Sequence, residues 1–151
     1  MAKELIPDSW VAIRAQFDDD DLDTVFRLRT CMPTRKVRRQ HPTMMIIKWP
    51  YEARKDGMPR QSDLKRMAAF EDALEVAVEA PAIGLQVACL TGNGRRTWRY
   101  FVADPGGFSS AVRPLLEAHG PGPHMFRQVE DPEWEGLAEL MPLLECAHDE
   151  S

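Results

Sequence analysis

Residues 62–80 read SDLKRMAAFEDALEVAVEA, and residues 85–102 read LQVACLTGNGRRTWRYFV. The first segment carries apolar side chains at helical spacing, so it predicts an amphipathic helix that Ser62 caps and Pro81 ends. The second segment has two alternating runs around Thr91–Gly94, a pattern that predicts a β-hairpin because Asn and Gly tolerate positive φ. A helix followed by a hairpin indicates the α+β class.

The residues before this helix predict three strands. Residues 10–17 and 25–32 alternate loosely around an acidic turn, so they favour an N-terminal hairpin. Residues 43–49, TMMIIKW, form an apolar run between two prolines, which is typical of a strand buried on both faces. The polar and basic residues 35–41 between these strands are interpreted as a loop.

The residues after the hairpin predict a second helix, a last strand and a short terminal helix. Asp104 and Pro105 predict the N-cap and the first residue of a helix that ends at His119. Pro114 lies inside this helix, so we expect it to kink the helix or to delay its start. Residues 124–129 then favour a strand, and residues 132–141 a short helix.

The order of these elements predicts a ferredoxin-like fold, the α/β plait. In it two helices cover one face of an antiparallel sheet. We expect a single domain over residues 1–151, with a plait core at about 43–130 and a terminal helix at about 132–141. The N-terminal hairpin, at about 9–32, lies outside that core in this interpretation, and the protein is a monomer or a homodimer.

Composition excludes several classes of protein. Of 151 residues, 44% are hydrophobic and 28% are charged, which is ordinary for a globular chain and excludes collagen-like or wholly disordered ones. No apolar run approaches the roughly 20 residues that cross a bilayer, and the first ten residues lack a signal-peptide core. Three cysteines without metal-binding spacing favour a reducing compartment, so we expect a cytoplasmic protein without membrane contact.

Charge is unevenly distributed along the chain. The net charge is -5, yet residues 1–60 carry 12 basic and 9 acidic groups, whereas residues 61–151 carry 7 basic and 15 acidic groups. From Glu130 onward there are eight acidic residues and no Lys or Arg. Two solvated faces of opposite sign are the simpler explanation of this pattern, and a docking surface for a charged partner is the functional alternative.

Four landmarks in order along the chain carry a resemblance to a known family. They are DGMP at 56–59, FEDALE at 70–75, LTGNGRR at 90–96 leading into WRYFV at 98–102, and EDPEW at 130–134. Together they resemble the bacterial domain-of-unknown-function family DUF695 from about Trp10 to Pro142. That family is similar in turn, more distantly, to the regulator of ribonuclease E activity B. The resemblance implies a plait fold and a non-enzymatic protein that binds and inhibits a nuclease scaffold.

No residues form a recognisable catalytic, cofactor or metal motif. The Gly-rich segment Thr91–Gly94 joins two strands, so it cannot present a phosphate to a helix N-terminus. The four histidines have no ligand spacing, and Cys89 is expected in the core. Glu71, Asp72 and Glu75 are expected on a solvated helix face, although paired carboxylates can perform acid–base chemistry when buried. The sequence therefore predicts no catalytic residue, cofactor or metal.

The acidic C-terminal segment is the first candidate interaction site. Trp134 anchors the last helix in one interpretation, and in the other it is a hot spot beside carboxylates that meet a basic protein partner. The partner-binding candidates are Glu130, Asp131, Glu133, Trp134 and Glu135.

A basic surface for RNA is the alternative. Plait-fold RNA binders stack bases on sheet aromatics, as Trp98 and Tyr100 could do unless they pack under the helices. The basic candidates are Arg35, Lys36, Arg38, Arg39, Arg95, Arg96 and Arg99. The sequence thus favours a non-catalytic protein-binding module with a regulatory role. An RNA-binding plait domain or an immunity or antitoxin-type protein is the alternative.

Overall fold

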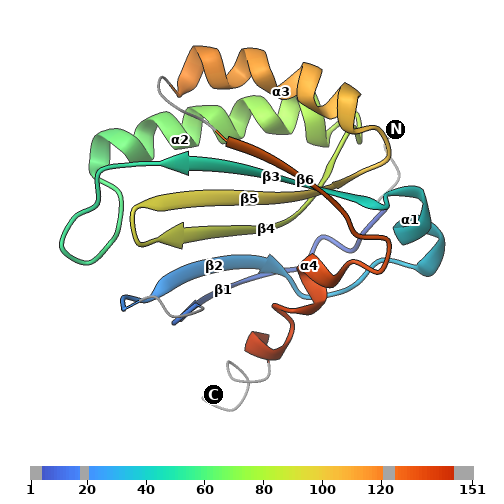
Figure 1. The fold of residues 1–151 in the computed structure, drawn as a ribbon, viewed down its shortest axis with the longest axis horizontal. Helices are drawn as coiled ribbons and strands as arrows, with labels where there is room; N and C mark the ends of the chain where they lie inside the picture. The colour runs from blue at the N-terminus through green and yellow to red at the C-terminus, as the bar shows by residue number, and fades with distance from the viewer. Residues whose placement is uncertain (1–4, 18–20, 121–124, 145–151) are drawn as a thin grey trace.

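Six segments rich in apolar side chains form one antiparallel sheet, and four α-helices accompany it in the computed structural model, which describes residues 5–17, 21–120 and 125–144 (Figure 1). The strands are β1 Trp10–Ala15, β2 Thr24–Arg29, β3 Thr43–Pro50, β4 Leu85–Gly92, β5 Arg95–Val102 and β6 Met125–Glu130. The helices are α1 Arg35–Gln40, α2 Gln61–Leu74, α3 Pro105–His119 and α4 Glu135–Ala138, and a π-helical turn, η1 Glu75–Glu79, continues α2. The spatial order of the strands is β1-β2-β4-β5-β3-β6.

The α+β class is confirmed, but the sheet is larger than the four-stranded core that the sequence suggests. The N-terminal hairpin was expected outside that core, and instead β2 pairs antiparallel with β4 from Val25 to Leu28. Phe26 and Leu28 on β2 have no exposed surface, so they need the cover that pairing beside β4 provides. The predicted acidic turn falls largely on residues 18–20, outside the described residues.

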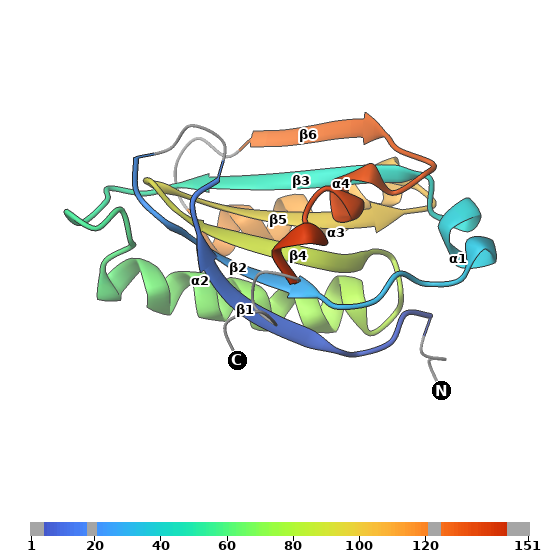
Figure 2. The same cartoon turned by 90° about the horizontal axis from the view of Figure 1, so that it is seen from below.

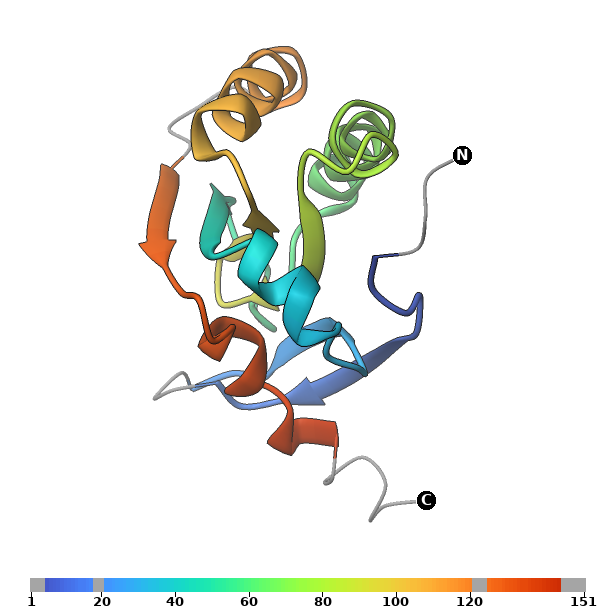
Figure 3. The same ribbon diagram turned by 90° about the vertical axis from the view of Figure 1, so that its right-hand side faces the viewer.

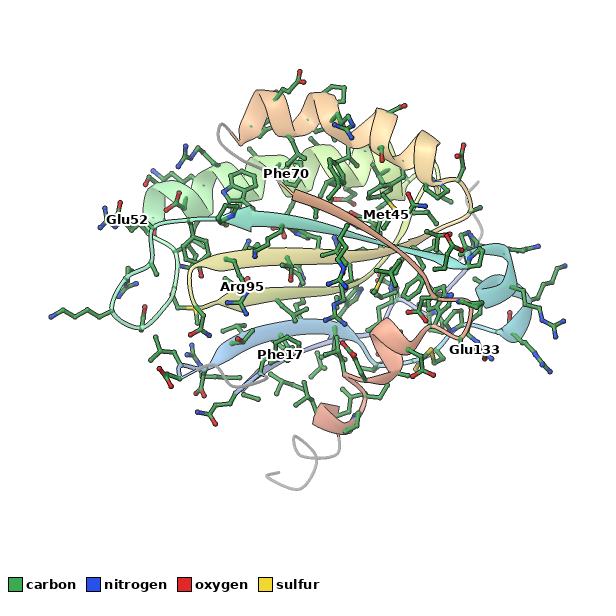
Figure 4. All side chains as sticks on the ribbon, viewed as in Figure 1. Phe17, Met45, Glu52, Phe70, Arg95 and Glu133 are labelled. Carbon is green, nitrogen blue, oxygen red and sulfur yellow. The ribbon has the colours of Figure 1, made fainter. Side chains whose placement is uncertain are left out.

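Both long helices cover one face of the sheet, as Figure 3 shows with the sheet seen end-on. Alternate residues of β3, Met45, Ile47 and Trp49, point to this covered face and pack against α2 and α3. Trp98 and Tyr100 on β5 do the same and are fully buried, as is Phe70 on α2, labelled in Figure 4. The sequence interpretation in which these two aromatics pack under the helices is therefore confirmed.

The opposite face of the sheet is covered at one end by the segment that contains α4. The α4 segment lies against it through Trp134, whose ring stacks on Phe101 at 4.0 Å between centroids. The indole nitrogen of Trp134 donates to the carbonyl oxygen of His41 at 2.9 Å. Gly136 allows this close approach, because a Cβ there would collide with the sulfur of Met44.

The basic segment at residues 35–41 is a helix, not the expected loop. Thr34 precedes α1, and its hydroxyl accepts a hydrogen bond from the backbone nitrogen of Val37 at 3.4 Å. Val37 is the buried residue of this helix and joins the core on the open side of the sheet. One apolar anchor and a Thr cap therefore order a segment whose composition alone indicates solvent exposure.

The two long helices follow the sequence prediction with local differences. The first begins at Gln61, just before the expected cap Ser62, and its last turn, η1, is π-helical. The second starts at Pro105 as expected and continues past Pro114, which is exposed, to His119. Among the described residues, no helix combines the length and the apolar character needed to cross a membrane.

Candidate functional site

A pocket of about 430 Å³ lies on the open face of the sheet, at the end that α4 leaves uncovered. Figure 2 views this face, with α4 crossing the sheet in front of the strands. The pocket receives side chains from β3, β4, β5 and β6, together with Thr24 of β2 and Phe17. Its lining includes four cationic residues: Lys48, Arg95, Arg99 and Arg127.

Strand alternation explains why these cations meet on one face. On β5 the residues Arg95, Thr97 and Arg99 point to the pocket, whereas the residues between them point to the helices. Lys48 on β3 lies directly opposite Thr97 in the strand register. Thr97 therefore has a cationic neighbour across the strand pair and another two residues away in each direction.

Arg127 enters the same face from the edge strand. It pairs with Ile46 of β3, and Ile46 pairs with Arg99 of β5, so the three side chains form one row across the sheet. Three strands thus contribute positive charge to one concave region.

Only part of this charge is neutralised. The Arg99 guanidinium binds the Glu139 carboxylate at 2.6 Å and the carbonyl oxygen of Gly136 at 2.6 Å, so it holds α4 in place. Lys48 and Arg127, by contrast, form no ion pair with any residue that the structure describes. Among the described residues, none that lines the pocket is a carboxylate. The region consequently favours an anion.

The rest of the pocket wall is largely apolar. Ile46, Leu90, Phe17 and Phe126 contribute to it, and the Phe17 ring lies 6.0 Å from the Arg99 guanidinium. Pockets of 300–1,000 Å³ with apolar walls and a few polar groups are typical ligand sites. Guanidinium and ammonium groups bind carboxylates and phosphates through charge-assisted hydrogen bonds. The arrangement can therefore hold a carboxylate or phosphate next to an aliphatic or aromatic group.

A second polar cluster lies on the covered face, below α2. Glu71, expected to be solvated, is instead partly buried and accepts a hydrogen bond from the indole nitrogen of Trp98 at 2.8 Å. Arg27 of β2 binds the same carboxylate oxygen at 3.1 Å, and Arg96 lies 3.7 Å from the other oxygen. Asp72 and Glu75 are exposed, as expected. Cations on this face are thus matched by an anion.

The cluster continues along the π-helical turn. The Tyr100 hydroxyl donates to Glu79 at 2.9 Å and accepts from the Gln86 amide at 2.9 Å. Burial raises the pKa of Glu79 above its usual value, and burial next to Glu79 raises the pKa of Tyr100 well above its usual value. No buried side-chain nitrogen or oxygen in the described chain lacks a partner, so this network fastens α2 to the sheet.

The predicted acidic partner site is divided by burial. Trp134 has no exposed surface, so it anchors α4 and does not offer its ring to a partner. Asp131 is also buried and accepts hydrogen bonds from the backbone nitrogens of Glu135 and Gly136, at 2.8 Å each. Glu130, Glu133 and Glu135 are exposed, and Figure 4 shows Glu133 near α1. Their contact with a basic partner stays a prediction.

The predicted basic set is not brought together. Arg35, Lys36, Arg38 and Arg39 lie on α1, beside Thr43 at the start of β3, whereas Arg95 pairs with Pro50 at the far end of that strand. Seven residue steps of about 3.3 Å separate those two ends, roughly 23 Å. Arg96 points to the covered face, so only Arg95 and Arg99 of the set line the pocket.

Sequence reasoning missed Lys48 and Arg127. The signal for Lys48 is present, because a lysine that interrupts the apolar run TMMIIKW must point to a face that tolerates charge. Arg127 carries no comparable signal, since its place in the pocket depends on β6 pairing with β3.

Histidine and cysteine do not build a site in the described residues. No group of three His, Cys, Asp or Glu side chains in that part of the chain could hold a metal ion. Cys89 is buried in β4 as expected, and Cys31 is exposed. His41 is buried, and its Nδ1 lies 2.8 Å from the carbonyl oxygen of Val37. Cys146, His124 and His148 lie outside the described residues.

Comparison with known proteins gives a family without an assigned activity. No curated protein and no solved structure matches the chain, so the more distant likeness to the regulator of ribonuclease E activity B receives no support. The family model described as "Family of unknown function (DUF695)" matches residues 8–141, which include every strand and helix described above. The chain therefore belongs to the family of unknown function DUF695.

Proposed function

We propose that this chain is a non-catalytic, regulatory protein-binding module whose basic pocket receives the carboxylates of an acidic segment of a partner protein. The observation that carries the proposal is the pocket itself, whose described lining residues include four cations and no carboxylate. Lys48 and Arg127 supply charge that no described residue neutralises. A carboxylate entering the pocket gains these contacts and relieves the repulsion between them.

The position of the aromatic side chains favours a protein ligand over RNA. Base stacking needs exposed rings on the sheet, and Trp98 and Tyr100 are buried under the helices. The rings that line the pocket are Phe17 and Phe126, which form parts of its wall beside Ile46 and Leu90. An acidic peptide with aliphatic side chains matches this mixture of charge and apolar surface.

This proposal reverses the partner charge that the sequence suggested. The sequence placed the contact on the acidic C-terminal residues, of which Asp131 and Trp134 are buried. The three exposed carboxylates, Glu130, Glu133 and Glu135, do not line the pocket. The basic pocket combines volume, charge and apolar wall, so it is the stronger basis for a binding function.

The test is selection of peptides from a random library of twelve residues displayed on phage. Peptides that bind the wild-type protein are expected to be enriched in Asp and Glu. The variant Lys48→Glu/Arg127→Glu should lower their affinity at least tenfold. The matched control is Arg35→Glu/Lys36→Glu, which makes the same charge change on α1 and should leave affinity within twofold.

Two results would overturn the proposal. One is that the selected peptides are not enriched in Asp and Glu. The other is equal loss of affinity in the pocket variant and the α1 variant, which would mean that net charge alone governs binding. A separate titration with single-stranded oligouridine tests whether the pocket binds RNA. If the oligonucleotide binds more tightly than the selected peptides, and the pocket variant loses that binding, the partner is a nucleic acid and not a protein.

A further inference from the structure

Strand β6 is an edge of the sheet, and one wall of the basic pocket belongs to it. It pairs with β3 from Met125 to Glu130 in a regular antiparallel register, and no other described strand lies beyond it. The outward-pointing backbone groups of an edge strand have no partner within the sheet and can pair with another chain. Figure 2 shows β6 along one margin of the sheet.

Only one of the two sheet edges is next to the pocket. The other edge is β1, and none of its residues lines the pocket. On β6, Phe126 and Arg127 contribute to the lining, and Arg127 is exposed. A chain segment that pairs with β6 would therefore lie beside the cations, whereas a segment on β1 would not.

The register defines where the side chains of an added strand would lie. A residue placed opposite Arg127 would extend the row that already contains Ile46 and Arg99. Directly opposed side chains lie about 4.5–5.5 Å apart at Cβ, so a carboxylate there meets the Arg127 guanidinium. The next residue on the same face falls in the row of Met125 and Lys48, about two strand spacings of 4.8 Å from Lys48. Two carboxylates separated by one residue thus match two unneutralised cations.

We propose that the acidic partner segment binds as an additional β-strand along β6, with alternate carboxylates directed over the basic pocket. This binding mode rests on the proposed function, because it assumes that the pocket receives a protein segment. Main-chain hydrogen bonds to β6 supply affinity, and the alternation of acidic residues supplies specificity.

The test uses two capped peptides of twelve residues with the same composition. One alternates Glu and Thr, and the other repeats Glu-Glu-Thr-Thr. The alternating peptide places all its carboxylates on one face of a strand, so it should bind the full chain at least tenfold more tightly than the block peptide. Lys48→Glu/Arg127→Glu should abolish this preference, and Arg35→Glu/Lys36→Glu should retain it.

Backbone methylation tests the strand directly. The alternating peptide is made with N-methyl groups on its odd residues and, separately, on its even residues. One of the two should lose binding at least tenfold, because its methyl groups replace the N–H donors that face β6. Hydrogen exchange of the protein should slow at the amides of residues 125–130 on addition of the unmodified peptide.

The outcomes separate the binding mode from the function. Equal affinity of both methylated peptides, together with unchanged exchange at β6, overturns strand addition. If the acidic peptides still bind through Lys48 and Arg127 in that case, the proposed function stands. If neither the alternating nor the block peptide binds, and the library yields no acidic sequences, both proposals fail.

Discussion

The two faces of the sheet treat positive charge in opposite ways. On the covered face Arg27 and Arg96 lie within 4 Å of one carboxylate, Glu71, which also accepts the Trp98 indole hydrogen. On the open face Lys48 and Arg127 reach a pocket that no carboxylate lines within the described parts of the chain. Strand β5 supplies both faces, because successive residues of a strand point to opposite sides: Arg96 faces the helices, whereas Arg95 and Arg99 line the pocket.

This difference indicates which cations serve stability and which are available for binding. A buried charge is costly unless it is paired, so the covered face carries a complete network. Solvent reaches the open pocket, so charge can remain there without a partner at modest cost. Surplus charge in an accessible concave site is then a candidate for recognition.

The largest expected difference concerns the thiol of Cys89, on the covered face. Burial raises its pKa from 9.0 to about 11, which reduces its reactive thiolate about a hundredfold at pH 8. In a Cys146→Ser background, iodoacetamide should label the exposed Cys31 at least a hundredfold faster than Cys89. Mass spectrometry of the labelled protein gives both rates, and comparable rates in the native protein would show that the covered face is open to solvent.

The next effect is on the free energy of unfolding. Glu71→Ala removes the acceptor of Trp98 and the partner of Arg27, so it should destabilise the protein by about 2–3 kcal/mol. Glu75→Ala, one helical turn away and exposed, is the matched control and should change stability by less than about 0.5 kcal/mol. Urea unfolding measures both, and equal effects would remove the distinction between a solvated and a structural carboxylate.

Removing the pocket cations should affect stability less. Lys48→Gln/Arg127→Gln should leave the free energy of unfolding within about 0.5 kcal/mol, with a small gain at low salt as repulsion is relieved. Arg96→Gln on the covered face loses its hydrogen bond to the Thr91 hydroxyl at 2.7 Å and should cost about 1 kcal/mol. A large loss in the pocket variant would mean that its cations hold the sheet together.

The smallest effect depends on pH. Burial raises the pKa of Glu79 in the folded protein above the usual 4.5, so the folded state favours the protonated acid. The wild type therefore loses stability as pH rises from about 4.5 through the raised folded pKa. Glu79→Gln still accepts from Tyr100 and avoids that loss. At neutral pH it should be more stable by roughly a few tenths of a kcal/mol, because solvent screens the half-buried carboxylate.

The thermal unfolding profile from pH 3 to 8 measures this pH dependence. The stability difference between Glu79→Gln and the wild type should vanish at the acidic end, where Glu79 is protonated in both the folded and the unfolded states. A difference that grows toward low pH would contradict the direction of the shift.

Most of the secondary structure could be predicted because its signals are local. The apolar spacing from Met67 to Val78, the Asn93–Gly94 turn and the Asp104–Pro105 helix start each depend on neighbouring residues. Asn93 and Gly94 indeed have positive φ, of 53° and 84°. The exception is α1, whose single buried residue, Val37, gives no periodic pattern from which a helix can be predicted.

The candidate site could not be predicted to the same extent because its residues meet only through strand pairing. Lys48 and Thr97 are neighbours through the β3–β5 register, and Arg127 joins them through the β3–β6 register. Trp134 was recognised in the sequence, but its role was not, since an aromatic residue beside carboxylates can be either a binding hot spot or a structural anchor. Its burial against Phe101 decides the matter.

The sequence by itself determined the α+β class and, apart from α1, the order of the elements, because these follow from propensity and periodicity along a short stretch of chain. Tertiary structure alone decided that the hairpin extends the sheet, that Glu71 neutralises the covered face and that four cations share one pocket. Register and edge position depend on contacts between residues far apart in the chain, and no local pattern encodes them.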